Sequence, residues 1–261
     1  MMKQKMISAG RALLFVVAFL MVSCVNRQIF FDSDDVPKAT QVRPLKGFER
    51  IDIYGSPTVY YTQADTFSIR VVGPEDMLDK IVTSVKDGTL SIRNKGKIGV
   101  VNISLHDAER LAVYVTSPDL VGVQLNGSGD FVSDQRVDTD NLAIVLRGSG
   151  DVHFRDIICD RCLTDLIGSG DVDIDQLEAQ SSSATLVGSG DIDIRQQRVR
   201  DTDISLKGSG DIKVFFGDGC QQVSCRLVGS GDITLKGKIE HLNKQKSGSG
   251  DIDTDKLTIE K

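Results

Sequence analysis

Aspartates at a regular spacing are the residues of this sequence that most readily suggest chemistry. The tetrapeptide Gly-Ser-Gly-Asp occurs seven times, beginning at residues 127, 148, 168, 188, 208, 229 and 248, with spacings of 21, 20, 20, 20, 21 and 19 residues. Its aspartates are Asp130, Asp151, Asp171, Asp191, Asp211, Asp232 and Asp251. A column of carboxylates could bind calcium, or it could supply the acid and base of a polysaccharide lyase or hydrolase.

The calcium interpretation requires more oxygen ligands than most repeats contain. Calcium takes six to eight oxygens, yet a second aspartate follows only in three repeats, as Asp173, Asp193 and Asp253. Carboxylates about 5 Å apart in water repel by roughly 0.8 kcal/mol. A hydrogen bond from a backbone N–H group to a carboxylate can return about 1.5–3 kcal/mol. We therefore interpret the column as structural turn residues and keep a calcium site as the alternative.

A catalytic interpretation lacks most of its parts. Paired carboxylates act as acid and base when their environments differ, whereas these aspartates recur in identical surroundings. The chain contains no tryptophan, and its three histidines, His106, His153 and His241, are far apart. We therefore expect no enzyme, no catalytic residue, no cofactor and no bound metal.

The cysteines form two pairs, Cys159-x-x-Cys162 and Cys220-x4-Cys225. In a stack of 20-residue repeats the pairs would lie three repeats apart, about 14 Å, which is too far for a shared zinc site or a disulfide. One disulfide within each repeat and buried free thiols both remain possible. We expect the thiols to face the interior.

The residues around each tetrapeptide alternate between apolar and polar. The position after the aspartate is apolar in all seven repeats: Phe131, Val152, Val172, Ile192, Ile212, Ile233 and Ile252. Two residues before the first glycine stand Leu125, Leu146, Leu166, Leu186, Leu206 and Leu227. Alternation with a period of two on both sides of a glycine-rich corner predicts a strand, a corner and a strand.

A fixed period of about 20 residues is typical of a solenoid, whose units bury their apolar faces by stacking. We predict an all-β fold, a right-handed parallel β-helix of about 20-residue coils. Its corners would use the glycine pairs Gly127 and Gly129, Gly148 and Gly150, Gly168 and Gly170, Gly188 and Gly190, Gly208 and Gly210, Gly229 and Gly231, and Gly248 and Gly250. Both glycines can adopt positive φ without a Cβ penalty, and serine and aspartate can bond nearby backbone N–H groups as in Asx and ST turns.

The segments at either end of the repeats predict how the stack is closed. Residues 45–125 predict an irregular β segment that caps the solenoid of residues 126–261, with Gly55-Ser56-Pro57-Thr58 as a degenerate corner. Asp87-Gly88 predicts a hairpin turn, and residues 74–80 a short helix. In the last coil Lys244 and Lys246 replace residues that are apolar elsewhere, and should protect the open end from stacking.

The N-terminus resembles a bacterial lipoprotein signal. Basic residues precede the apolar run 12–22, which is too short to span a bilayer. Ser23-Cys24 then resembles a lipobox, with cleavage after residue 23 and acylation of Cys24, as by palmitate; a plain signal peptide is the alternative. Residues 1–23 would be the signal peptide, and residues 24–44 the lipidated cysteine and a flexible tether.

The charge of the chain limits its partners. There are 31 basic and 37 acidic residues, a net charge of −6, and no basic tract is interleaved with aromatic residues. Loss of the signal would remove three positive and no negative charges, giving −9. Nucleic acid is therefore excluded as an expected partner.

Several motifs together resemble the GIN-domain family, described as auto-transporter adhesin heads. They are the lipobox, the segments Phe-Glu-Arg-Ile-Asp-Ile-Tyr-Gly-Ser at 48–56, Asp-Gly-Thr-Leu-Ser-Ile at 87–92 and Ser-Pro-Asp-Leu at 117–120, and the seven tetrapeptides. The resemblance covers about residues 45–261 and implies a β-helical protein of the bacterial envelope. Pro57 and Thr58 depart from the glycine and aspartate of the other corners.

From these features we expect a non-enzymatic lipoprotein of the cell envelope, anchored through Cys24 in the outer membrane and facing the periplasm or the cell surface. Its solenoid would present a surface for adhesion to an extended polymer or protein. The alternatives are a structural or self-associating component, including a homo-oligomer, and a calcium-dependent or polysaccharide-acting β-helix. Phe215, which alternation directs outward, is a candidate for partner contact.

Overall fold

The computed structural model describes residues 38–95 and 111–260. Within these residues the chain forms nineteen strands and a single short 3-10 helix, η1 (Glu75–Lys80). The predicted signal peptide, Cys24 and the first part of the predicted tether lie outside the described residues, as does His106.

The strands form two walls around one hydrophobic core. The first wall consists, in hydrogen-bonded order, of β5 (Ile81–Lys86), β6 (Thr89–Asn94), β2 (Arg50–Gly55), β8 (Gly122–Gly127), β10 (Asn141–Gly148), the second halves of β11 (Val152–Gly168) and β12 (Asp171–Gly188), β14 (Asp201–Gly208), β16 (Gln222–Gly229) and β18 (His241–Gly248). The second wall consists of β1 (Lys38–Val42), β4 (Ser68–Pro74), β7 (Ala112–Ser117), β3 (Thr58–Gln63), β9 (Phe131–Asp138), the first halves of β11 and β12, β13 (Asp191–Gln197), β15 (Asp211–Phe216), β17 (Ile233–Ile239) and β19 (Ile252–Ile259).

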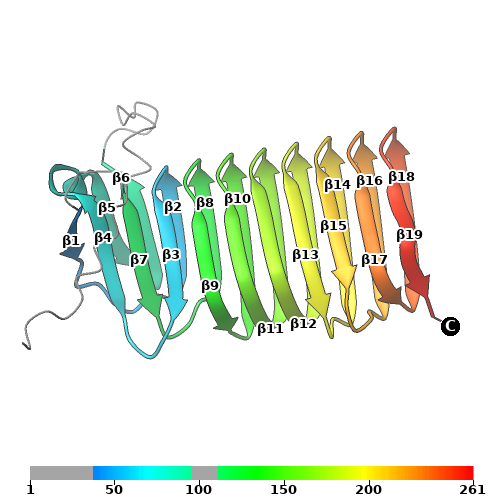
Figure 1. The fold of residues 1–261 in the computed structure, drawn as a ribbon, viewed down its shortest axis with the longest axis horizontal. Helices are drawn as coiled ribbons and strands as arrows, with labels where there is room; N and C mark the ends of the chain where they lie inside the picture. Colours follow the sequence, from blue (N-terminus) through cyan, green and yellow to red (C-terminus); the bar gives the residue numbers. More distant parts are fainter. Residues whose placement is uncertain (1–37, 96–110, 261) are drawn as a thin grey trace, which may run out of the picture. The chain divides into compact units, whose positions relative to one another are not determined.

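Each repeat forms one rung: a first-wall strand, a Gly-Ser-Gly-Asp corner, and a second-wall strand. We call the side with these corners the first edge, and the side where the chain passes to the next rung the second edge. Neighbouring rungs pair in parallel, so that Ile192 lies between Val172 and Ile212. The successive rungs stand in a row in Figure 1. The predicted β-solenoid is confirmed.

The alternating residues fill the space between the walls, as predicted. Ile192 and Ile212 have no exposed surface. A polar group also lies inside: the Gln196 amide donates to the Ser182 hydroxyl (2.8 Å) and accepts from the Thr202 hydroxyl (2.8 Å). Because each buried polar atom named here has a partner, this network avoids the cost of an unsatisfied buried group.

Both glycines of a corner lie too close to the preceding rung for a side chain, since a Cβ on Gly148 would lie 2.0 Å from the carbonyl oxygen of Gly127. The first glycine also needs a positive φ. Gly148 has a φ of +145°, a region that side chains disfavour. Gly150 is not among the residues with positive φ, so only the first glycine of the corner uses this conformational freedom. A Cβ on Gly150 would lie 1.8 Å from the carbonyl oxygen of Gly129 in the preceding rung. The second glycine is required by the closeness of the neighbouring rung.

Backbone hydrogen bonds hold these corners together. The carbonyl of Gly127 accepts from the backbone N–H groups of Ser149 (3.0 Å) and Gly150 (3.2 Å) in the next rung. The degenerate corner behaves in the same way, since the carbonyl of Gly55 accepts from Ser128 and Gly129, both at 3.0 Å. Gly55 also has positive φ and pairs with Gly127. It therefore forms one more corner of the same stack.

Differences in repeat length are absorbed away from these corners. Phe216 pairs with Gln196, twenty residues earlier, whereas Gln222 pairs with Asp201, twenty-one residues earlier. The extra residue of that repeat therefore lies at the second edge. The other 21-residue repeat is accommodated by a shift in register between β9 and β11.

The N-terminal strands are not stacked in the order of the chain. Strand β2 pairs with β6 on one side and β8 on the other, and β3 pairs with β7 and β9. The rung of β2 and β3 is thus enclosed by rungs formed later in the sequence. The predicted Asp87-Gly88 hairpin connects β5 and β6, and η1 occupies most of the predicted short helix.

The predicted flexible tether ends earlier than residue 44. Lys38–Val42 form β1, which pairs antiparallel with β4 at the end of the second wall. An edge strand is held by backbone hydrogen bonds and needs no strong apolar pattern, which explains why the alternation of these residues did not reveal it. At the opposite end Lys244 and Lys246 are exposed. In the register of β16 with β18 they lie opposite Cys225 and Leu227, so they occupy positions that are buried in the preceding rung of the first wall.

The corner geometry makes a testable prediction about Gly170, where a Cβ would lie 1.9 Å from the carbonyl oxygen of Gly150. Gly170→Ala should destabilise the protein by about 3 kcal/mol, because the backbones of two rungs must separate. Ser169→Ala is the matched control, since Ser169 is exposed. Urea unfolding followed by circular dichroism measures both. Equal stability of the two variants would contradict the steric requirement.

Candidate functional site

The corner aspartates form a ladder between rungs. The backbone N–H group of Asp171 donates to Oδ1 of Asp151 (3.1 Å), and that of Asp191 donates to Oδ1 of Asp171 (3.0 Å). The same bond recurs along the column at distances of 2.7–3.4 Å. We expected these carboxylates to bond N–H groups within their own turn. They bond the next rung instead, because the stacked corners bring its N–H group closer.

The ladder ends differently at its two ends. At the N-terminal end, the hydroxyl of Thr58 donates to Oδ2 of Asp130 (3.2 Å), so threonine replaces aspartate in the degenerate corner while keeping a bond to the next rung. At the C-terminal end, the Lys246 ammonium donates to Asp251 (3.3 Å). This bond, together with a backbone hydrogen bond and the charge of Lys246, lowers the pKa of Asp251.

The second aspartate of some repeats faces outward on the second wall. Asp173 pairs with Asp193 in the next rung and with His153 in the preceding one. Partial burial, followed by the charge of Asp193, raises the pKa of Asp173. Within residues 38–95 and 111–260, no group of three or more His, Cys, Asp or Glu residues is arranged to hold a metal ion.

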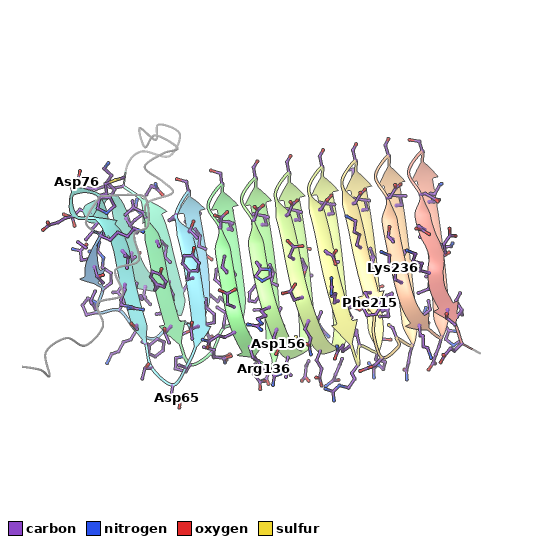
Figure 2. All side chains as sticks on the ribbon, in the orientation of Figure 1. Asp65, Asp76, Arg136, Asp156, Phe215 and Lys236 are labelled. Atoms are coloured by element: carbon purple, nitrogen blue, oxygen red, sulfur yellow. The ribbon has the colours of Figure 1, made fainter. Side chains whose placement is uncertain are left out.

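Ladders of side-chain ion pairs connect the rungs at the second edge. Arg136 contacts Asp156 at 2.7 Å, and Figure 2 shows the two residues side by side in the lower part of the view. Arg198 pairs with Glu178, and Lys238 pairs with Glu260 at 2.9 Å. These exposed pairs join neighbouring rungs, and because solvent screens them each is expected to add little to the stability.

The four cysteines of the solenoid are buried free thiols, as their predicted inward orientation requires. Neither of the local disulfides that we considered is formed. Strand pairing places Cys162 beside Ser182 and Cys225 beside Ile204, so the two cysteine pairs lie in well-separated rungs. A shared metal site is therefore ruled out by the register.

The thiols differ in their acidity. Burial raises the pKa of Cys225 to about 12. The hydrogen bond with Cys159, and burial, raise the pKa of Cys162, while the same hydrogen bond lowers the pKa of Cys159. Cys159 is therefore the thiol that forms a thiolate most easily of the four.

Exposed aromatic residues lie on the outer side of the second wall. Tyr60 and Tyr114 stack at a ring distance of 5.1 Å, and the guanidinium of Arg70 lies 5.4 Å from the Tyr114 ring. Phe215, which alternation directs outward, is 46% exposed on β15. The sequence indicated Phe215, but it did not indicate the tyrosine pair, since Tyr60 and Tyr114 become neighbours only through the pairing of β3 with β7.

The aspartate ladder predicts a difference between two substitutions at Asp191. Asp191→Asn keeps an oxygen that can accept the N–H bond of Asp211, now 3.0 Å long, whereas Asp191→Ala removes it. We expect the alanine variant to lose about 1–3 kcal/mol and the asparagine variant markedly less. Urea unfolding with EDTA or with added calcium measures both. Equal losses, together with stabilisation of the unsubstituted protein by calcium, would instead indicate a metal ligand.

The difference in acidity between Cys159 and Cys225 predicts a difference in their rates of alkylation. In the folded protein at pH 8, Cys159 should react with iodoacetamide faster than Cys225 by about tenfold or more, because only thiolates are alkylated rapidly. Peptide mass spectrometry measures the labelling of each cysteine. In urea all four should react at similar rates, which serves as the control. Rapid labelling of Cys225 in the folded state would contradict its burial.

No helix among the described residues is long and apolar enough to cross a bilayer.

Comparison with known proteins shows where this architecture occurs. A crystal structure of an adhesin, described as putative, from Bacteroides fragilis superposes with a TM-score of 0.69 and 28% identity, covering 83% of this chain and 96% of that one. A second such adhesin, from Parabacteroides distasonis, has a TM-score of 0.69, 20% identity and coverages of 84% and 97%. A "putative lipid binding protein" from Parabacteroides distasonis has a TM-score of 0.61, 22% identity and coverages of 86% and 97%. The latter two share the fold.

The search of curated proteins found no match. The family model described as "Putative auto-transporter adhesin, head GIN domain" matches residues 47–219, about two thirds of the chain. This match confirms the resemblance inferred from the repeat and its flanking motifs. The chain therefore belongs to this GIN-domain family.

Proposed function

We propose that this protein is a non-enzymatic lipoprotein of the cell envelope, anchored through Cys24, whose solenoid binds an extended partner along its outer wall. The family and the adhesin from Bacteroides fragilis support an adhesin-like role. The lipobox at Ser23-Cys24 supports the anchor. Two acyl chains on one cysteine are sufficient for stable attachment to a bilayer.

The observation that carries the proposal is a continuous file of outward side chains along the second wall. Strand pairing aligns Arg70, Tyr114, Tyr60, Val132, His153, Asp173, Asp193, Lys213, Thr234 and Asp253. With strands about 4.8 Å apart, the file is roughly 43 Å long. A polymer or an extended peptide can contact many such positions at once, because they follow one another along the wall.

The corner ladder supports a role without catalysis. Each carboxylate from Asp130 to Asp232 accepts a hydrogen bond from the backbone of the next rung. A catalytic pair of carboxylates needs two different environments, and the repeated corners provide the same one at each rung. The carboxylates therefore stabilise the stack.

The charge of the chain supports a position clear of the membrane. After loss of the signal the net charge would be −9, so an anionic lipid surface would repel the solenoid. Residues 25–37 connect Cys24 to the first described strand. This segment would allow the outer walls to face a partner away from the bilayer.

The anchor is tested by Cys24→Ala in the bacterium that produces the protein. We expect loss of metabolic palmitate labelling and release from the membrane fraction, because no acyl chain can be attached. Val25→Ala is the matched control and should keep both properties. If the role in adhesion is correct, cells with Cys24→Ala should also adhere at least tenfold less to immobilised envelope polysaccharide. Unchanged adherence of cells lacking the anchored protein would contradict that role.

A further inference from the structure

Phe215 occupies the centre of a cationic cluster on the second wall. On β15 the flanking Val214 and Phe216 are buried, while Phe215 points outward and is 46% exposed. Strand pairing places Phe215 between Arg195 on β13 and Lys236 on β17. Figure 2 shows Phe215 and Lys236 close together on neighbouring strands.

A shallow depression surrounds the ring of Phe215. It has a volume of about 230 Å³, and its polar lining consists of Asp193, Arg195, Lys213, Thr234 and Lys236. Three cations thus face an exposed aromatic ring, with a single carboxylate in the same lining. On a chain with a net charge of −6 this is a local reversal of sign.

The cations of this cluster are also available to a ligand. None of Arg195, Lys213 and Lys236 forms an ion pair with any described residue. The depression at the second edge near Cys220 differs, because its Lys238 is paired with Glu260 and its Arg198 with Glu178. The cluster around Phe215 therefore has cations whose ionic partner is not supplied by the described part of the chain.

We propose that this cluster, Arg195, Lys213, Phe215 and Lys236, binds an acidic sugar unit of a polysaccharide, a proposal that rests on the adhesin-like function above. An apolar face of the sugar ring stacks on Phe215, since a rigid aromatic ring provides contact area at low entropic cost. The planar guanidinium of Arg195 binds the sugar carboxylate through two parallel hydrogen bonds. Lys213 and Lys236 add positive charge on either side.

The residues next to the cluster favour a carboxylated sugar over a densely charged polymer. Lys213 lies between Asp193 and Thr234 in its own file, and Thr234 pairs with Asp253. These carboxylates repel a chain with a phosphate at each step but can accept hydrogen bonds from sugar hydroxyls. The geometry therefore suits a single carboxylate surrounded by hydroxyl groups.

The site can be tested with the purified full-length protein in detergent and immobilised polygalacturonate as the probe. Fully methyl-esterified polygalacturonate is the matched control polymer, because it has the same sugar backbone without the negative charge. We expect binding to polygalacturonate that weakens with salt, and binding to the ester at least tenfold weaker. Phe215→Ala and Arg195→Ala should each weaken binding to polygalacturonate at least tenfold.

Two further variants separate the site from its surroundings. Phe215→Trp preserves the stacking surface and should retain binding. Tyr54→Ala removes an aromatic side chain that is 40% exposed on β2, in the first wall, and should have no effect. Because Phe215 and Arg195 are exposed, the thermal unfolding midpoints of all variants should remain within a few degrees of the unsubstituted protein.

Several results would overturn the assignment. They are unchanged binding after Phe215→Ala and Arg195→Ala, equal binding to the methyl ester, equal binding to polyglutamate or duplex DNA, and a loss of binding after Tyr54→Ala that matches the loss after Phe215→Ala. No binding to polygalacturonate would also overturn it. In each case the adherence of cells with Cys24→Ala reports separately on the adhesin-like function, so the two proposals can fail independently.

Discussion

The structure depends on the contact between successive Gly-Ser-Gly-Asp corners. A Cβ on Gly170 or Gly190 would lie 1.9 Å from a carbonyl oxygen of the preceding rung, so the two backbones leave no space for a side chain. The same closeness allows the first glycine carbonyl to accept hydrogen bonds from the next rung and the aspartate carboxylate to accept another. A shift by one residue would place serine against this contact. The corners therefore fix the register of the first wall and of the beginning of each second-wall strand.

Once the register is fixed, the inward and outward residues have different constraints. The inward file of Val172, Ile192 and Ile212 is apolar and similar in size, because these side chains pack in one core. Polar residues that point inward need a partner there, as Gln196 has. Outward positions are free to vary. In the file that includes Asp193 and Lys213, for example, the charge of the side chain changes sign from one rung to the next. Recognition by a stacked protein of this kind resides in the outer side chains of the walls, while the repeated corners maintain the scaffold.

The two edges are stabilised by different means. The first edge relies on backbone groups and on carboxylates that bond the next rung. The second edge absorbs differences in repeat length and is joined by exposed ion pairs such as Arg136 with Asp156. The cations around Phe215 differ from those of the second edge. They lie on the second wall and form no ion pair with any described residue, whereas the cations of the second edge are paired.

The order of the residues is sufficient to predict the repeat, the strands and the buried side of each strand, because it contains periods of two and of twenty residues. Ile192, Phe215 and the inward cysteines could be placed from these periods alone. Features that depend on contacts between rungs could be seen only in the folded chain. The role of Gly150, the ladder from Asp151 to Asp171, and the position of β2 between β6 and β8 arise from groups that are far apart along the chain. A local pattern of apolar residues holds no information about which rung will lie against it.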